Sequence, residues 1–584
     1  MRTELRFLLA IVLMFVVLVG TNFLFPPVPP EEPTGPGADT TAAATPGDTG
    51  APGGGGGAGD TAAAPSGAAP PGAVTPTVPD PAQPGGVVLA PAGPAAEERL
   101  LVETPLHRFE FSTLGARLLS AELSQFQALN REGVVELVPD GTDDLFGQRL
   151  VVGQDTVDLG RAPFRAEPEG GLTLSAGTGP ATQRFVYEHP TADLRFVLEY
   201  TFDPDFYLVA VTGRVEGLDR PLLLTSLGEG IAFAEADSAN EAGMMAYVYN
   251  HLRDGIESEA TRGADPRIVP GPLVWAAFRS KFFVTAMLAG ASDEALSDAD
   301  YLGGLIVRGS ELADRVHVTA AQTVGNDGRF DYRLYMGPQE YARLTSLGQG
   351  MEEVNPYGWR FFRPIIRPFV AIIIAIMTFL HTTLSIGYGW VLIVFGVAMR
   401  IVLWPLNHKA MKAQLRNMAV QPLVTEIQKQ HKDNPEKLQK EMMKLYKEHG
   451  FNPLAGCIPM LLPWPVLIAL FFVFQYTIEL RGVSFLWLPD LSAKDPLYLL
   501  PILLAASMFA MQWVSLRSLD QPNPQMKMMM WMMPGIMLFI FMNLASGLNL
   551  YYATANIATI PQQIWIANER KKMKGKPPPK LSGD

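Results

Sequence analysis

The chain lacks the residues and spacings on which most enzymes and disulfide-stabilised proteins depend. Cys457 is the only cysteine in 584 residues, which excludes an intrachain disulfide, a cysteine-based zinc site and a redox pair. It lies far from the N-terminus, so a lipid-modified N-terminal anchor is excluded as well. Between 96 and 345 there is no G-x-S-x-G, no H-E-x-x-H and no phosphate-binding loop. The sequence therefore gives no support to a metal, nucleotide or other cofactor.

Lysine is scarce in the first part of the chain. Residues 96–350 hold 38 acidic and 21 basic residues, and Lys281 is the only lysine among them. Residues 351–584 hold 13 acidic and 23 basic residues. Because lysine and arginine mark cytoplasmic loops, this asymmetry predicts an acidic middle outside the membrane and basic C-terminal loops inside. The net charge of −12 is then an average over two compartments and is no evidence for nucleic-acid binding.

The first 95 residues predict an anchor and a tether. Met1–Phe25 carries Arg2 and Arg6 ahead of a long apolar run without an A-x-A cleavage site. This favours an uncleaved transmembrane segment with its N-terminus inside, and a cleaved signal peptide is the alternative. Residues 26–95 are almost entirely Pro, Gly, Ala and Thr, a composition that predicts a disordered periplasmic tether.

Residues 96–350 predict a β-sandwich domain. Apolar and polar residues alternate over 107–113, 184–189, 193–202 and 206–215, with turn residues between them. The histidines are widely separated and show no metal-ligand spacing. The carboxylates fit a solvated acidic surface better than a catalytic pair.

The last third of the chain predicts a helical membrane bundle. Apolar runs occupy 387–406, 458–478, 497–516, 528–544 and 548–567, lengths that approach or reach the ~20 residues of a spanning helix. With the N-terminal anchor they make six spans with both termini in the cytoplasm. Only one crossing fits between the outer β domain and the basic loop at 407. Residues 356–385 are therefore expected to form an amphipathic helix on the outer interface.

Two basic segments should face the cytoplasm. The loop 407–452 predicts a hairpin of two helices, the second capped by Asn434, and its charge includes Lys412, Arg416, Lys440 and Lys444. It is either a solvated connector or a docking arm for substrate, ribosome or lipid headgroups. The tail 569–584 is also basic.

Arg400 is the one charged residue inside the run 389–406. A cation at the centre of a spanning helix costs ~2.5–3.5 kcal/mol on insertion scales. Six residues separate it from the end of the run, which places it about 9 Å inside at a rise of ~1.5 Å per residue. It either extends its side chain to the interface or lies in an internal, water-filled polar site.

Two further features fall in the last two spans. The first is a methionine cluster with Met528, Met529, Met532 and Met533, which is either an adaptable apolar slide for substrate or lipid-facing filler. The second is a polar strip with Asn549, Tyr551, Tyr552 and Asn556. It either holds helices together or faces the same cavity as Arg400. The spans carry no paired acids and no series of protonatable residues, which weakens an ion-coupled transporter.

Four segments resemble the YidC/Oxa/Alb membrane protein insertase family, and the whole layout is similar to its bacterial members with a large periplasmic domain. They are MRIVLWPL (399–406), EMMKLYKEHGFNPLAGCIP (441–459), DLSAKDPLYLLPIL (490–503) and SGLNLYY (546–552). A weaker likeness in the β region rests on VWAAFRSKFF (274–283) and YMGP (335–338).

This resemblance implies a multi-pass protein of the bacterial inner membrane, an insertase and chaperone and not an enzyme. Its implied partners are nascent membrane proteins, the Sec translocon, the ribosome and the lipid bilayer. It implies a β-supersandwich outside, and a hydrophilic groove open to the cytoplasm in which Arg400 contacts the inserting segment. The aromatic residue that the family carries on its last span corresponds to Tyr551 or Tyr552, and Tyr552 is the better match. No cofactor or metal is implied.

Two positions depart from the family pattern. Pro463 stands where relatives often have glutamine, and Gly396 replaces a hydroxyl residue found in some members. Both make the expected groove less polar and leave more of its role to Arg400. The alternatives are a membrane-anchored carbohydrate-binding or sugar-modifying protein and a solute channel. Deleting 110–340 should leave an insertase active and abolish a sugar enzyme.

Overall fold

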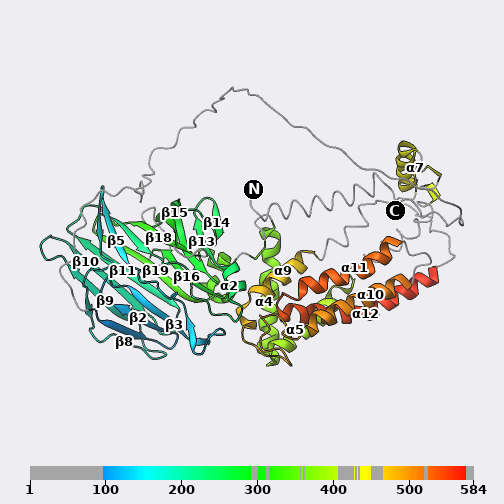
Figure 1. Ribbon diagram of the computed structural model, residues 1–584, viewed down its shortest axis with the longest axis horizontal. Helices are drawn as coiled ribbons and strands as arrows, with labels where there is room; N and C mark the ends of the chain where they lie inside the picture. Colours follow the sequence, from blue (N-terminus) through cyan, green and yellow to red (C-terminus); the bar gives the residue numbers. More distant parts are fainter. Residues whose placement is uncertain are drawn as a thin grey trace, which may run out of the picture. The chain divides into compact units, whose positions relative to one another are not determined.

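The computed structural model describes residues 97–405, 426–448, 464–517 and 524–573, apart from gaps at 291–299, 311–314, 356, 359–361, 428–429 and 432–433 (Figure 1). By internal contacts the chain divides into two units. One contains the segment 418–452, and the other contains 76–417 and 453–579. The predicted anchor, the tether, most of the first hairpin helix and residues 574–584 of the tail lie outside the described residues.

The β domain consists of two sheets. The smaller has the order β4-β3-β2-β1-β8 and the larger follows β6-β5-β12-β18-β17-β15-β16-β19-β11-β10-β9-β7, with β13 and β14 paired beside β15. The strands of the smaller sheet are β1 Arg99–Glu103, β2 His107–Ser112, β3 Leu118–Gln127, β4 Val134–Glu136 and β8 Leu172–Thr173. Those of the larger sheet are β5 Gln148–Val152, β6 Asp155–Asp158, β7 Arg165–Glu167, β9 Ala181–Glu188, β10 Arg195–Phe202, β11 Leu208–Glu216, β12 Leu222–Ser226, β13 Ala246–His251, β14 Gly255–Ala260, β15 Arg267–Arg279, β16 Phe283–Ala289, β17 Leu302–Gly309, β18 Val316–Thr323 and β19 Arg329–Pro338.

Aromatic side chains join the two sheets into one core. Phe111 of β2 lies 5.7 Å from Phe185 of β9 and 5.0 Å from Tyr200 of β10, measured between ring centroids. All three are almost fully buried. The four alternating runs of the sequence form β2, β9, β10 and β11, which confirms the predicted β-rich sandwich. Its chain continues past the last strand through two short helices, α3 Tyr341–Ser346 and η1 Met351–Val354.

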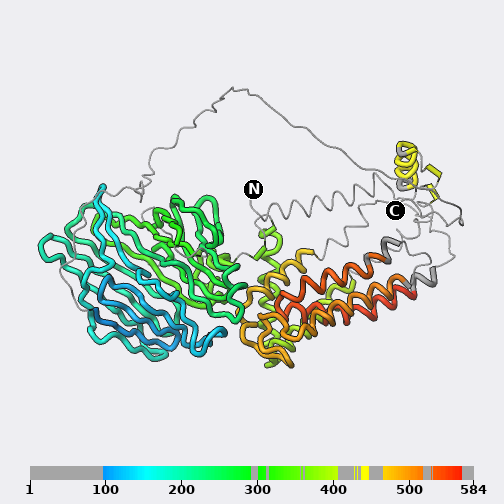
Figure 2. Tube along the Cα trace, viewed as in Figure 1, coloured from blue at the N-terminus to red at the C-terminus, as the bar shows by residue number. Residues whose placement is uncertain are grey.

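The C-terminal helices share a second hydrophobic core, which joins α4, α5, α9 and the starts of α10 and α12. In Figure 2 the helices α10, α11 and α12 (orange to red) run side by side, as their contacts also show. Within the β domain a short helix, α2 Ser238–Met244, precedes β13. The others are α4 Arg363–Leu384, α5 Tyr388–Val402, α9 Trp464–Tyr476, η3 Ile478–Leu480, α10 Leu499–Arg517, α11 Pro524–Phe541 and α12 Ser546–Met573.

Ser546 and Gly547 precede the apolar run 548–567, and they form the first turn of α12. The N–H groups at the start of a helix have no partner within it. Here Ser546 N donates to Ala493 O at 2.7 Å and Gly547 N to Leu491 O at 2.8 Å. These contacts allow the helix to begin two residues earlier than its apolar run.

Two described helices are long and apolar enough to cross a bilayer, α4 and the segment 499–516 of α10. Three shorter apolar helices accompany them, Tyr388–Val402, Trp464–Tyr476 and Met530–Phe541. α4 packs against α9 and α5, and in Figure 1 it runs across the other helices. It buries Val370 and Ile373 and leaves Ile372 and Phe379 exposed. Apolar residues therefore lie on both the buried and the exposed face of α4.

The helix α7, Pro435–Glu448, is described in the other unit. Lys437 N donates to Asn434 Oδ1 at 3.1 Å, which confirms Asn434 as the N-cap. Leu438 is buried, whereas Lys440 and Lys444 are exposed. Lys412 and Arg416 lie outside the described residues.

Candidate functional site

α5 carries Arg400 and packs closely on α12. A Cβ at Gly396 would lie 3.4 Å from Thr554 Cγ2 and 3.5 Å from the Tyr551 ring. Helix backbones approach most closely where one of them carries a small residue. Gly396 therefore allows the backbones of α5 and α12 to approach each other closely.

Arg400 lies in the last turn of α5, one turn beyond Gly396. Its side chain is partly buried, while its neighbours Ile401 and Val402 are 66% and 67% exposed. Arg400 makes no ion pair with another described residue, and its electrostatic neighbours are the phenols of Tyr551 and Tyr552. The guanidinium therefore lies between a polar aromatic pair and an apolar surface suited to lipid.

Tyr551 and Tyr552 lie in the second turn of α12, and both contact α9. The Tyr551 ring is buried and lies 5.8 Å from Phe395 of α5 and 5.3 Å from Phe474 of α9. The Tyr552 hydroxyl donates to Leu467 O of α9 at 3.4 Å. The structure thus brings Arg400 and both tyrosines together between α5, α9 and α12.

The two asparagines of the predicted groove lie in helix contacts. Asn549 is fully buried, and its Nδ2 donates to Phe541 O at the end of α11 at 3.0 Å. Asn556 Nδ2 donates to Ser507 Oγ of α10 at 3.3 Å. Both amides therefore serve as polar links between helices, one of the two roles the sequence left open.

The methionine cluster lies on an exposed part of α11. Met528, Met532 and Met533 are 58%, 48% and 39% exposed. Met529 belongs to the same helix, and its side chain lies outside the described residues. The exposed surface continues at Trp531. This arrangement is compatible with a substrate slide and with simple lipid contact.

Further buried polar residues, which the sequence pattern does not single out, lie on α9, directly after it and on α10. Gln475 is 8% exposed and its Oε1 has no partner among the described residues; Thr477 Oγ1 is in the same situation. Ser507 Oγ accepts a hydrogen bond from Asn556 Nδ2 and donates one to Leu504 O. A lone glutamine inside the run ALFFVFQY was the available signal for the first of these.

The fold and the site together define a class of protein: an apolar helical bundle with a partly buried arginine, attached to a large β-sandwich. Within the described ranges, no three His, Cys, Asp or Glu side chains lie close enough to hold a metal ion.

Comparison with known proteins identifies the family within this class. The model for the 60Kd inner membrane protein matches residues 379–574, and the model for the YidC periplasmic domain matches 99–372. The membrane protein insertase YidC of Chlorobaculum parvum is 31% identical over 82% of this chain and 83% of its own length. That of Chlorobium luteolum is 30% identical over 82% and 84%. A crystal structure of an active YidC insertase matches with 17% identity and a TM-score of 0.32, over 81% of this chain and 93% of that one. The chain belongs to the YidC family of membrane protein insertases.

Proposed function

We propose that this protein inserts transmembrane segments into the bilayer and assists their folding, acting alone or beside the Sec translocon. A client segment would enter from the cytoplasm, contact Arg400 and leave sideways into lipid. Its large domain would face the periplasm, with six spans and both termini in the cytoplasm. Family membership and the charge asymmetry of the chain support this topology.

The observation that carries the proposal is the placement of Arg400. The residue is partly buried in an apolar bundle, and no described carboxylate neutralises it. An unpaired cation in such a place is unfavourable and points to function. An acidic or polar residue of a client would gain a partner there, which would lower the free energy of moving that residue into the membrane.

The hydroxyls of Tyr551 and Tyr552 extend the polar surface around Arg400, and the exposed Ile401 and Val402 begin the apolar one. A segment in contact with both surfaces could exchange water for lipid in small steps. α4 would lie on the outer interface, and Lys440 and Lys444 on α7 would contribute to ribosome or headgroup binding.

Photocrosslinking from position 400 tests the proposal. A photoreactive amino acid at 400 should crosslink to a ribosome-bound nascent chain while its first transmembrane segment is emerging, and lose that crosslink once the segment is released. Position 402 on the same turn is the matched lipid-facing control, and Leu392, which is fully buried, is the matched interior control. Equal client labelling from 400 and 392, or none from 400, would contradict the groove.

A further inference from the structure

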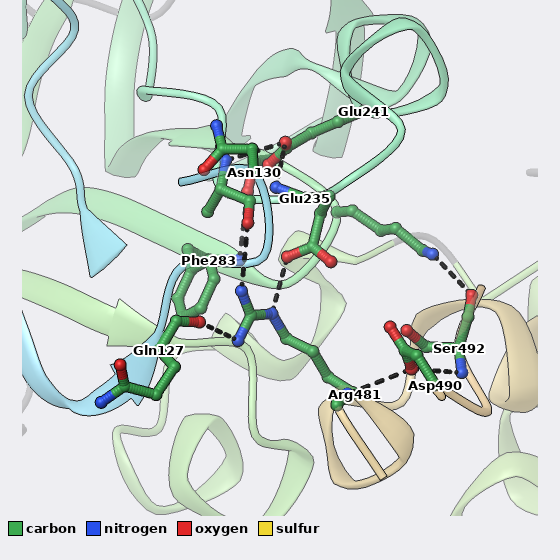
Figure 3. Close-up of polar contacts among 12 residues, drawn as sticks. Gln127, Asn130, Glu235, Glu241, Phe283, Arg481, Asp490 and Ser492 are labelled. Carbon is green, nitrogen blue, oxygen red and sulfur yellow. Dashed lines mark hydrogen bonds and ion pairs between the residues drawn. The ribbon is translucent and has the colours of Figure 1, made fainter. Parts of the chain in front are cut away.

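The loop between α9 and α10 is held by the β domain through a buried arginine (Figure 3). Arg481 Nε donates to Glu235 Oε1 at 2.6 Å, Nη1 to Gln127 O at 2.9 Å and Nη2 to Ala234 O at 3.3 Å. Its guanidinium carbon lies 5.1 Å from the centre of the Phe283 ring. The side chains of Arg481 and Glu235 are 5% and 7% exposed, so this contact is closed to solvent.

Lys281 makes a second contact with the same loop. It is the only lysine of the acidic region, and its Nζ donates to Ser492 O at 2.9 Å. Lys281 is 7% exposed, and burial lowers its pKa while burial raises the pKa of Glu235. The segment VWAAFRSKFF therefore contacts the loop, because Lys281 binds the Ser492 carbonyl and the Phe283 ring lies against Arg481.

The other side of the loop holds the start of α12. Ser546 N and Gly547 N donate to the carbonyls of Ala493 and Leu491, and Ser546 Oγ donates to Asp490 O at 3.0 Å. Asp490 Oδ1 in turn accepts from Gly482 N at 3.0 Å and from Ser492 N at 2.8 Å. The carbonyl oxygen of Ser492, which accepts from Lys281, therefore lies between those of Leu491 and Ala493. These two accept from the first backbone N–H groups of α12.

A short path of contacts therefore leads from the β domain to the candidate site. It runs from Lys281 and Arg481 through loop 481–498 to Ser546, and α12 then carries Tyr551 and Tyr552 less than two turns further on. Partly exposed links accompany it, such as Lys494 Nζ to Asp237 Oδ2 at 3.2 Å. A buried charge pair gives one defined geometry, because sliding the surfaces would leave a charge unpaired.

From this path we infer that Arg481 and Lys281 are positioning residues for insertion: the docked β domain fixes loop 481–498, and the loop fixes the start of α12 and its two tyrosines. The inference rests on the proposed insertase function. In this inference the β domain acts only by positioning the loop, through Arg481 and Lys281. Deleting 110–340 removes the same contacts as Arg481→Met combined with Lys281→Met, and it should therefore slow insertion no more than that double variant does.

The experiment uses the full chain in proteoliposomes without the Sec translocon and a single-span client with an acidic translocated tail. Arg481→Met and Lys281→Met should each lower the insertion rate about fivefold and raise amide exchange at 491–493 and 546–549 at least tenfold. Lys494→Met, which removes a half-exposed ion pair of the same loop, is the matched control and should change either quantity less than twofold.

A paired variant guards against simple loss of folding. Glu235→Met with Arg481→Met replaces the buried pair by apolar side chains, a change that is often tolerated. It should restore both exchange protection and insertion relative to Arg481→Met alone. Unchanged insertion despite raised exchange, or unchanged exchange, would overturn the positioning role. Crosslinking from position 400 separates this result from failure of the proposed function, because wild-type protein without a client crosslink would refute the function itself.

Discussion

The Cβ position of Gly396 lies 3.5 Å from both the ring and the carbonyl oxygen of Tyr551. These are ordinary contact distances, so one methyl group fits and a larger side chain does not. The absence of a side chain at Gly396 therefore allows α5 to approach α12 closely.

Substitution at Gly396 should therefore depend on size. Gly396→Ala should be neutral or raise the free energy of unfolding by up to ~1 kcal/mol, because alanine favours helix. Gly396→Leu should lower it by roughly 1–3 kcal/mol through overpacking. Denaturation in detergent micelles measures both. Gly535→Leu on α11 is the matched control, since a Cβ there meets nothing within 4 Å. An equal effect of leucine at the two positions would contradict the prediction.

Arg400 should act through its charge. Arg400→Ala should lower the insertion rate of a client with an acidic translocated tail about tenfold or more. Arg400→Lys should retain part of the activity, because a cation remains although the planar guanidinium is lost. A client with a neutral tail should be affected less by either change. Insertion assays in reconstituted vesicles with the paired clients test this, and equal loss for both clients would argue against an electrostatic role.

The Arg481–Glu235 pair should show strong coupling in stability. Breaking a buried ion pair by removing one partner costs about 3–5 kcal/mol, because the other charge stays buried and unpaired. Arg481→Met and Glu235→Met should each show a loss of that order, and the double variant clearly less than their sum. Denaturant midpoints of the wild type, the two single variants and the double variant complete the double-mutant cycle. Additive losses would mean that the pair, 2.6 Å apart, is not coupled.

Glu241 of α2 should make stability depend on pH. It is fully buried, and its Oε2 accepts from Ala234 N at 2.9 Å and from Glu235 N at 3.0 Å. Burial, followed by the nearby Glu235 carboxylate, raises the pKa of Glu241 from 4.5 to about 7. The folded state therefore holds a proton that the unfolded state releases. Stability should fall as pH rises from 4.5 to 7, by at most ~3 kcal/mol. Glu241→Gln should remove this contribution to the pH slope in thermal melts across that range, and an unaltered slope would refute the assignment.

His107 should contribute the opposite slope. Its Nε2 lies 2.9 Å from Met336 O, and its ring stacks on Phe109 at 4.6 Å. Burial lowers the pKa of His107 from 6.5 to about 4. The folded state therefore binds fewer protons than the unfolded state between these values. The stability that His107 contributes should be complete above pH 6.5 and should decline as pH falls toward 4.

The two groups should partly cancel in the wild-type protein between pH 4.5 and 6.5. His107→Gln keeps an amide donor for Met336 O and removes the titration, so its melting temperature should rise on acidification through Glu241 alone. In Glu241→Gln only the His107 contribution remains, so the melting temperature should fall on acidification. Parallel pH profiles of the two variants would contradict the assigned signs.

Local patterns were enough to predict most elements. Alternation marked β2, β9, β10 and β11, because each strand has one face in the core and the side-chain period is two. Apolar runs marked α5, α9, α10, α11 and α12 to within a few residues at most ends. The cap at Asn434 was predictable because an asparagine followed by proline in the first turn satisfies a helix start locally.

The sequence by itself determined the order of the parts, the single arginine of the run 389–406 and the charge asymmetry from which a direction across a membrane is predicted. Only the tertiary structure decided which polar residues meet. It placed Asn549 and Asn556 in helix contacts, Tyr551 and Tyr552 near Arg400, and Arg481 on Glu235, 246 positions away in the chain. Periodicity shows which face of an element is buried, since burial is a local pattern. It does not show which buried partner a charge finds, because that depends on how distant segments pack.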